Sequence, residues 1–142
     1  MAVVTTLYPQ FKFDLLNKAT NVTTDVLKVA LFSASTYTST DTAYTTSGTE
    51  VANANGYTTG GATSGAVTTS TATTTPNLVK IAGTTSWTAT GAGFSAVAAK
   101  VYNSTVSNHP VAHVDFGGTN TASGGGTFTI TWDSTNGLFN LA

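Results

Sequence analysis

The most regular alternation of apolar and polar positions lies near the C-terminus, in residues 126–132. Because side chains on a strand point to opposite faces in turn, this stretch predicts a strand with one apolar and one hydroxyl face. The turn-forming pair Asn136-Gly137 follows, and then a short apolar run at 138–141. Asn-Gly adopts positive φ easily, so the two runs predict a terminal hairpin. We expect the centre of the core to be its apolar ridge of Phe128, Ile130 and Trp132.

Similar runs recur along the rest of the chain. Residues 25–32 are apolar on both faces, which is typical of a central strand covered on both sides. Turn signals rich in Gly, Asn and Pro separate the runs, and no alternation of strands with helices is visible. About eight short strands in this arrangement predict an all-β fold, a single β-sandwich for which a jelly roll is one candidate topology. The further strands are expected at 48–52, 66–75 (an edge strand), 77–82, 83–89, 94–103 and 111–116, with residues 117–126 as a turn region.

One short helix is expected at residues 9–19, after an apolar N-terminal arm at 1–8. Pro9 suits the first helical position because its ring fixes φ. The period predicts an inner face of Phe11, Leu15 and Ala19, with Leu16 beside them. The polar face would carry Lys12, Asp14 and Lys18.

Residues 33–65 form a long, nearly uncharged stretch rich in Ser, Thr, Gly and Tyr. Loops of this length in small domains are usually functional or disordered. Tyrosine is favoured at protein interfaces, so the stretch is expected to contact a partner, and a surface loop without a partner is the alternative. The candidate contact residues in the arm and the loop are Val3, Val4, Leu7, Tyr8, Tyr37, Tyr44 and Tyr57.

Composition narrows the classes of function. A chain of 142 residues suggests one domain, residues 1–142, and it has no Cys for a disulfide or a thiolate site. Only 8% of residues are charged, and the net charge is −1. The cations are five scattered lysines, whereas binding to nucleic acid needs clustered ones. A neutral, Thr-rich surface suits a protein that sits among copies of itself.

No membrane partner is expected, because no apolar run approaches the length of a transmembrane helix. The first residues lack the basic region and long apolar run of a signal peptide. The chain is therefore expected to stay in the cytosol or to leave the cell within an assembly.

The candidate chemistry is sparse. His109, His113 and Asp115 share strand parity, but a metal site would need a fourth ligand, so a polar outer strand face is expected. No Gly-x-Ser-x-Gly motif, carboxylate pair or phosphate-binding glycine loop is apparent. Trp87 and Trp132 could stack on a sugar, although core positions are favoured for both. We therefore expect no enzyme activity, no cofactor and no metal.

The order of several segments resembles a family of small virion structural proteins of tailed bacteriophages. These segments span nearly the whole chain: 11–16 followed by 27–31, then 56–63, Trp87 with 98–102, 110–117, and 126–132 closing with 137–139.

The resemblance implies a capsid decoration (cement) subunit, made in the host cytoplasm and bound to the outer capsid surface of the virion. Its partners would be the major capsid protein and other copies of itself, as a homotrimer. The resemblance transfers no catalytic residues. A tail component (tube, baseplate or fibre-associated) is the first alternative. A carbohydrate-binding surface module is the second, and it would require a solvent-facing Trp87 together with exposed loop tyrosines.

Overall fold

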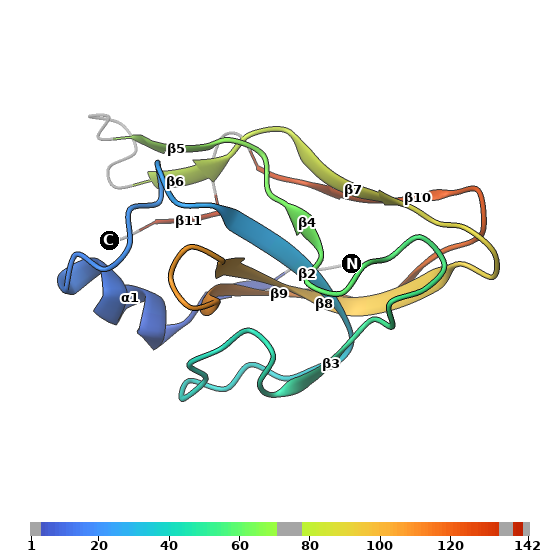
Figure 1. Cartoon of the computed structure of the whole chain (residues 1–142), viewed down its shortest axis with the longest axis horizontal. Helices are drawn as coiled ribbons and strands as arrows, with labels where there is room; N and C mark the ends of the chain where they lie inside the picture. The colour runs from blue at the N-terminus through green and yellow to red at the C-terminus, as the bar shows by residue number, and fades with distance from the viewer. Residues whose placement is uncertain (1–3, 71–77, 134–137, 141–142) are drawn as a thin grey trace.

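A computed structural model describes residues 4–70, 78–133 and 138–140 (Figure 1). It consists mainly of antiparallel strands with one short helix, arranged as two layers around an apolar core. The prediction of an all-β, sandwich-like fold is confirmed.

The larger sheet has the strand order β1-β9-β8-β2-β3, and β4 also pairs with β2. Its central strands are long, and all the pairings are antiparallel. The bounds are β1 (Val4–Leu7), β2 (Leu27–Ser35), β3 (Gly48–Glu50), β4 (Ala62–Thr63), β8 (Phe94–Asn103) and β9 (His109–Ala122). The described part of the predicted N-terminal arm is therefore an edge strand of this sheet rather than a free segment.

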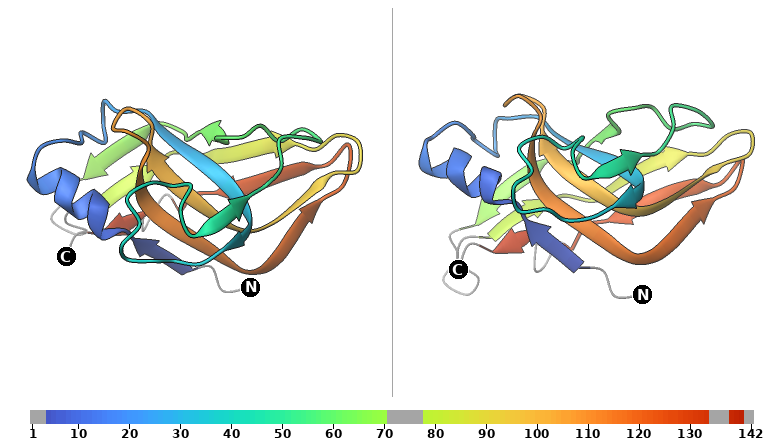
Figure 2. Two further views of the ribbon diagram at one scale, coloured as in Figure 1. Left: turned by 60° about the horizontal axis from the view of Figure 1, so that its bottom comes forward. Right: turned by 90° about the horizontal axis from the view of Figure 1, so that it is seen from below.

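The second layer is built from two small sheets, β10-β7 and β11-β6-β5. Their strands are β5 (Val67–Ser70), β6 (Leu78–Ile81), β7 (Thr84–Thr88), β10 (Thr127–Thr131) and β11 (Phe139–Asn140). The Trp132 N–H donates a hydrogen bond to the Gly83 carbonyl at 3.1 Å. Along the chain, this bond lies between the β10–β7 pairs and the β11–β6 pairs. Figure 1 shows the two small sheets following one another along one side of the larger sheet, and Figure 2 shows the same layering from two other directions.

The predicted terminal hairpin is wrong. β10 pairs with β7 and β11 pairs with β6, so the two C-terminal runs add to two strands from the middle of the chain. The register places Phe128 opposite Trp87, and their rings meet edge to face at 6.1 Å. Aromatic cross-strand pairs of this kind contribute about 0.2–1 kcal/mol to a sheet.

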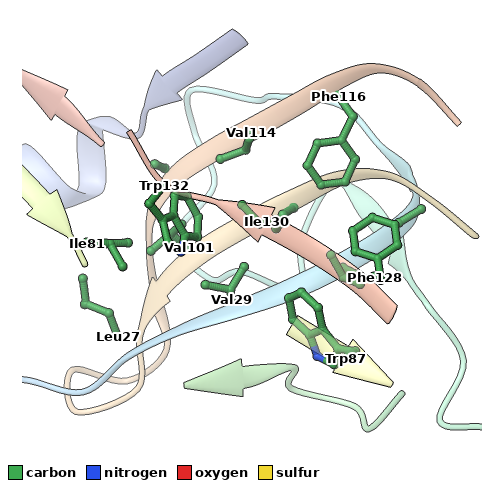
Figure 3. Close-up of a cluster of buried hydrophobic side chains, with 14 of the residues drawn as sticks. Leu27, Val29, Ile81, Trp87, Val101, Val114, Phe116, Phe128, Ile130 and Trp132 are labelled. Carbon is green, nitrogen blue, oxygen red and sulfur yellow. The ribbon is translucent and has the colours of Figure 1, made fainter. Parts of the chain in front are cut away.

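The predicted apolar ridge is confirmed as part of the core. Phe128, Ile130 and Trp132 are 7%, 9% and 8% exposed, and they belong to one cluster that draws residues from both layers. Figure 3 shows these side chains packed among residues of β2, β8 and β9.

Strand β9 is much longer than the predicted 111–116. It continues to Ala122 through the glycine-rich segment that was expected to turn. The pairing with β8 shifts register between Ala96 and Ala98, and Gly117 has a φ of 71° there. The glycines therefore serve a β-bulge inside one strand, since a bulge often needs a residue with positive φ.

Helix α1 (Pro9–Leu16) begins at Pro9 as predicted but ends earlier than residue 19. Phe11 is buried and Leu15 is partly buried, as expected. Asp14 is also buried, because its carboxylate accepts hydrogen bonds from within the fold, whereas the sequence placed it on the polar face. Phe13 and Leu16 face outward, 61% and 84% exposed.

The outer face of the larger sheet is covered by a loop at residues 36–47. Ala30 and Phe32 of β2 form a second apolar cluster with Tyr44 of this loop and with Ala98 and Tyr102 of β8. The prediction that β2 is covered on both faces is confirmed, and a tyrosine-bearing loop supplies the outer cover.

Candidate functional site

Most of the predicted contact tyrosines hold the protein's own fold together. Tyr8, Tyr44 and Tyr57 are 0%, 7% and 2% exposed. The Tyr44 ring stacks on Tyr102 at 3.9 Å, and Tyr37, which is half-buried, packs on Tyr8 at 5.1 Å. The expectation that these rings are offered to a partner is corrected for the three buried ones, because their surface is already covered.

The apolar residues of the arm are placed differently. Val4 is 57% exposed on edge strand β1, and Leu7 is partly buried against the core. Val3 lies outside the described residues. Among the described members of the predicted contact set, Val4 is therefore the one that presents a large free apolar surface.

A buried charge lies beneath the 36–47 loop. Lys100 of β8 is 0% exposed, and its Nζ lies 3.6 Å from Oδ2 of Asp41. The same Nζ donates to the Thr46 carbonyl and lies 4.9 Å from the centre of the Phe32 ring. Burial lowers the pKa of Lys100, and the Asp41 carboxylate opposes this shift. The arrangement ties the loop to the sheet, since a buried ammonium needs both a counter-charge and a hydrogen bond.

His113 of β9 lies under the same loop. It is 4% exposed, and its Nε2 is 3.0 Å from the hydroxyl oxygen of Ser35. Burial lowers the pKa of His113, and the nearby Lys100 ammonium lowers it further. His113 lies on the predicted outer face of its strand, but this face is covered by the loop and not solvated. No feature of the sequence indicated that the loop would cover it.

The three residues considered for a metal site do not converge. His109 Nδ1 is 2.8 Å from Oδ2 of Asp14 on α1. Asp115 is exposed and accepts a hydrogen bond from the Gly117 N–H at 2.8 Å. Within the described residues, no group of three or more His, Asp or Glu side chains could hold a metal ion.

Glu50 organises the second half of the long loop. Its Oε1 accepts hydrogen bonds from the Tyr57 hydroxyl at 2.7 Å and from the Gly60 N–H at 2.6 Å. The Tyr57 oxygen in turn accepts the Leu31 N–H at 2.9 Å. Burial, and then the hydrogen bond to Glu50, raise the pKa of Tyr57 well above its ordinary range. The carboxylate therefore acts as an anchor between the loop and central strand β2.

Neither tryptophan forms a surface platform. Trp87 and Trp132 are 6% and 8% exposed, and the Trp132 Nε1–H donates to the Thr85 hydroxyl at 2.9 Å. The preference for core positions is confirmed for both. The solvent-facing Trp87 that a carbohydrate-binding module would require is not present.

The exposed large apolar side chains are the remaining candidates for contact with a partner. Phe13 and Leu16 are three residues apart on α1, so they lie next to each other on its outer face. Val4 and Val26 are also exposed, at 57% and 45%. The sequence placed Leu16 beside the inner face, whereas the structure exposes Leu16 and buries Asp14, which contacts His109.

An open groove of about 360 Å³ separates β10 from the second half of β9. Phe116, Phe128 and Ile130 supply much of its apolar lining, and Thr127, Thr129 and Thr131 border it. No ionisable side chain lines it, so this groove is suited to apolar and backbone contacts rather than to acid–base chemistry.

No helix in the described part of the chain has the length and apolar character needed to cross a lipid bilayer. No family model, curated protein or solved structure matches the chain.

Proposed function

We propose that this protein is a structural subunit of a tailed-bacteriophage virion that decorates the outer surface of the capsid. The resemblance of the ordered segments supports this proposal. The single structural observation that carries it is the exposed pair Phe13 and Leu16 on an otherwise weakly charged, hydroxyl-rich surface. Exposed apolar side chains that gather on one element are typical of a surface that binds another protein.

The capsid contact would bury this pair on the major capsid protein. Burial stabilises by about 25 cal/mol per Å² of apolar surface, so two side chains give a modest free energy per copy. Binding to the assembled shell but not to its separated subunits would stabilise the shell by mass action, and many copies add their effects. Any oligomer of the protein would present several such pairs to the shell at once.

The test adds purified protein to shells prepared without it and measures co-sedimentation and the temperature at which the shells open. We expect binding and a higher opening temperature. The double variant Phe13→Ser, Leu16→Ser should bind at least about tenfold more weakly, since about 1.4 kcal/mol corresponds to a factor of ten. Val26→Ser removes an exposed apolar side chain outside α1 and is the matched control, expected to bind as the unchanged protein does.

Wild-type protein that neither sediments with the shells nor raises their opening temperature would contradict the proposal. Gold-labelled antibody on intact virions gives the second arm of the test. Antibody label found along the tail and not on the head would contradict capsid decoration and would indicate a tail function.

A further inference from the structure

Strand β10 has one paired edge and one free edge. The Ala89 N–H donates to the Gly126 carbonyl at 2.8 Å, and the Trp132 N–H donates to Gly83 at 3.1 Å, so the even-numbered positions bond toward β7. Backbone groups alternate in direction along an antiparallel strand. Those of Thr127, Thr129 and Thr131 therefore point to the opposite edge. Among the described residues, no strand pairs with β10 on that side.

This edge lacks the usual protection against pairing. Natural edge strands often carry Lys, Pro, a bulge or an inward charge, which discourage another strand from adding. β10 has the sequence Thr-Phe-Thr-Ile-Thr and a regular register with β7. Because β10 carries no charged side chain, another strand could pair with this edge without burying an unpaired charge.

The groove beside the edge favours a particular partner. It lies on the side of β10 that carries Phe128 and Ile130, and Phe116 of β9 lines its far wall. A strand added to β10 would direct every second side chain into this space, because its pleat continues that of β10. The added strand should therefore present apolar residues at alternate positions and hydroxyl or other uncharged residues between them.

We propose that this edge pairs with the β10 edge of a second copy of the chain, antiparallel and about a two-fold axis at Thr129. In this register Thr129 faces the partner subunit's Thr129, and Thr127 faces the partner subunit's Thr131. Phe128 then lies beside the partner subunit's Ile130 on the apolar face of the joined sheet. The outward backbone groups of each subunit's Thr127, Thr129 and Thr131 are satisfied by the pairing.

The choice of a second copy follows from the symmetry of the pattern. The alternation Thr, apolar, Thr, apolar, Thr is the same when read in either direction, so one strand complements itself in an isologous contact. The net charge of −1 gives little repulsion between copies. The inference does not depend on capsid binding, which was assigned to Phe13 and Leu16.

A disulfide test locates the axis, since the natural chain has no cysteine. Residues directly opposite on hydrogen-bonded antiparallel strands have Cα atoms about 5.5 Å apart, within the range a disulfide spans. Thr129→Cys should therefore give a covalent dimer under mild oxidation. Ser86→Cys is the matched control, because Ser86 is the exposed neighbour of Thr129 on β7. The two Ser86 positions would lie roughly 14 Å apart, three strand spacings, and should stay unlinked.

A second measurement uses light scattering coupled to size exclusion. The unchanged protein should show the mass of a dimer. Thr129→Pro should be a folded monomer, because it removes an N–H that bonds only across the proposed contact, and Thr129→Val should remain dimeric. A folded Thr129→Cys variant that does not cross-link would overturn the pairing. A wild-type monomer or trimer would also overturn it, and neither outcome bears on capsid binding.

Discussion

Among single residues, Tyr57 shows how one hydroxyl joins two parts of the chain. Its oxygen accepts the N–H of Leu31 and its proton goes to Glu50, with both partners under 3 Å away. Tyr57→Phe leaves the buried Leu31 N–H unpaired and should lower the free energy of unfolding by about 1–3 kcal/mol.

The matched control is Tyr37→Phe. Tyr37 is half-buried, and its hydroxyl donates to the Leu7 carbonyl at 3.2 Å, where water can take over the bond. The control should change the unfolding free energy by less than about 0.5 kcal/mol, as surface substitutions usually do. Urea denaturation measures both variants, and equal losses would show that Tyr57 is not an anchor.

His113 gives a prediction about pH. Because burial and Lys100 lower its pKa in the folded protein below the ordinary 6.5, the unfolded chain binds more protons between the two values. The free energy of unfolding should therefore fall as the pH drops below about 6.5, with a slope of at most about 1.4 kcal/mol per pH unit from this group. The loss should stop growing once the pH is below the folded pKa.

The measurement compares urea midpoints between pH 7.5 and 5.5 for the wild type and for His113→Gln, which keeps a polar group near Ser35 without the titration. The variant should show a shallower dependence on pH. His109→Gln is the control for the other histidine, which is bound to Asp14. Identical slopes in wild type and His113→Gln would contradict the prediction.

Whole elements show what the sequence could and could not predict. The alternation of apolar and polar residues predicted β10, and apolar runs predicted β2 and β8. These predictions succeeded because the burial of a strand residue depends on which face of the strand it occupies. The pairing of β10 with β7 was missed, since local turn signals say nothing about partners from the middle of the chain. The buried state of Lys100 and His113 was missed for a related reason, because both lie beneath a loop that has no hydrophobic period of its own.

The two-residue strand β4 depends on a glycine. Gly61, just before β4, has a φ of 68°, and a side chain there would overlap the backbone carbonyl of Val29 in β2. Gly83 has a similar φ of 71° but open space around it. Gly83→Ala should cost about 1–2 kcal/mol from backbone strain alone, whereas Gly61→Ala should cost at least about 4 kcal/mol because the strands must separate. Thermal unfolding of the two variants, side by side, checks the difference, and similar melting temperatures would contradict it.

On the scale of the whole molecule, one apolar cluster joins both layers. It includes Val29 and Val101 from the larger sheet with Trp87 and Ile130 from the second layer. Neither layer can keep its apolar face covered if the other leaves. The chain should therefore unfold in a single cooperative transition, as most domains under 150 residues do.

The variant Trp87→Phe leaves Trp132 as the sole tryptophan, a reporter buried in the second layer, while far-ultraviolet circular dichroism reports strands from both layers. We expect the two signals to change at the same urea concentration. Trp132→Phe, which leaves Trp87 as the reporter, is the control for effects of the substitution itself. A fluorescence change that precedes the loss of circular dichroism in both variants would mean that the second layer melts first. The apolar cluster would then be too weak to couple the layers, and a partner subunit would be needed to hold β10 in place.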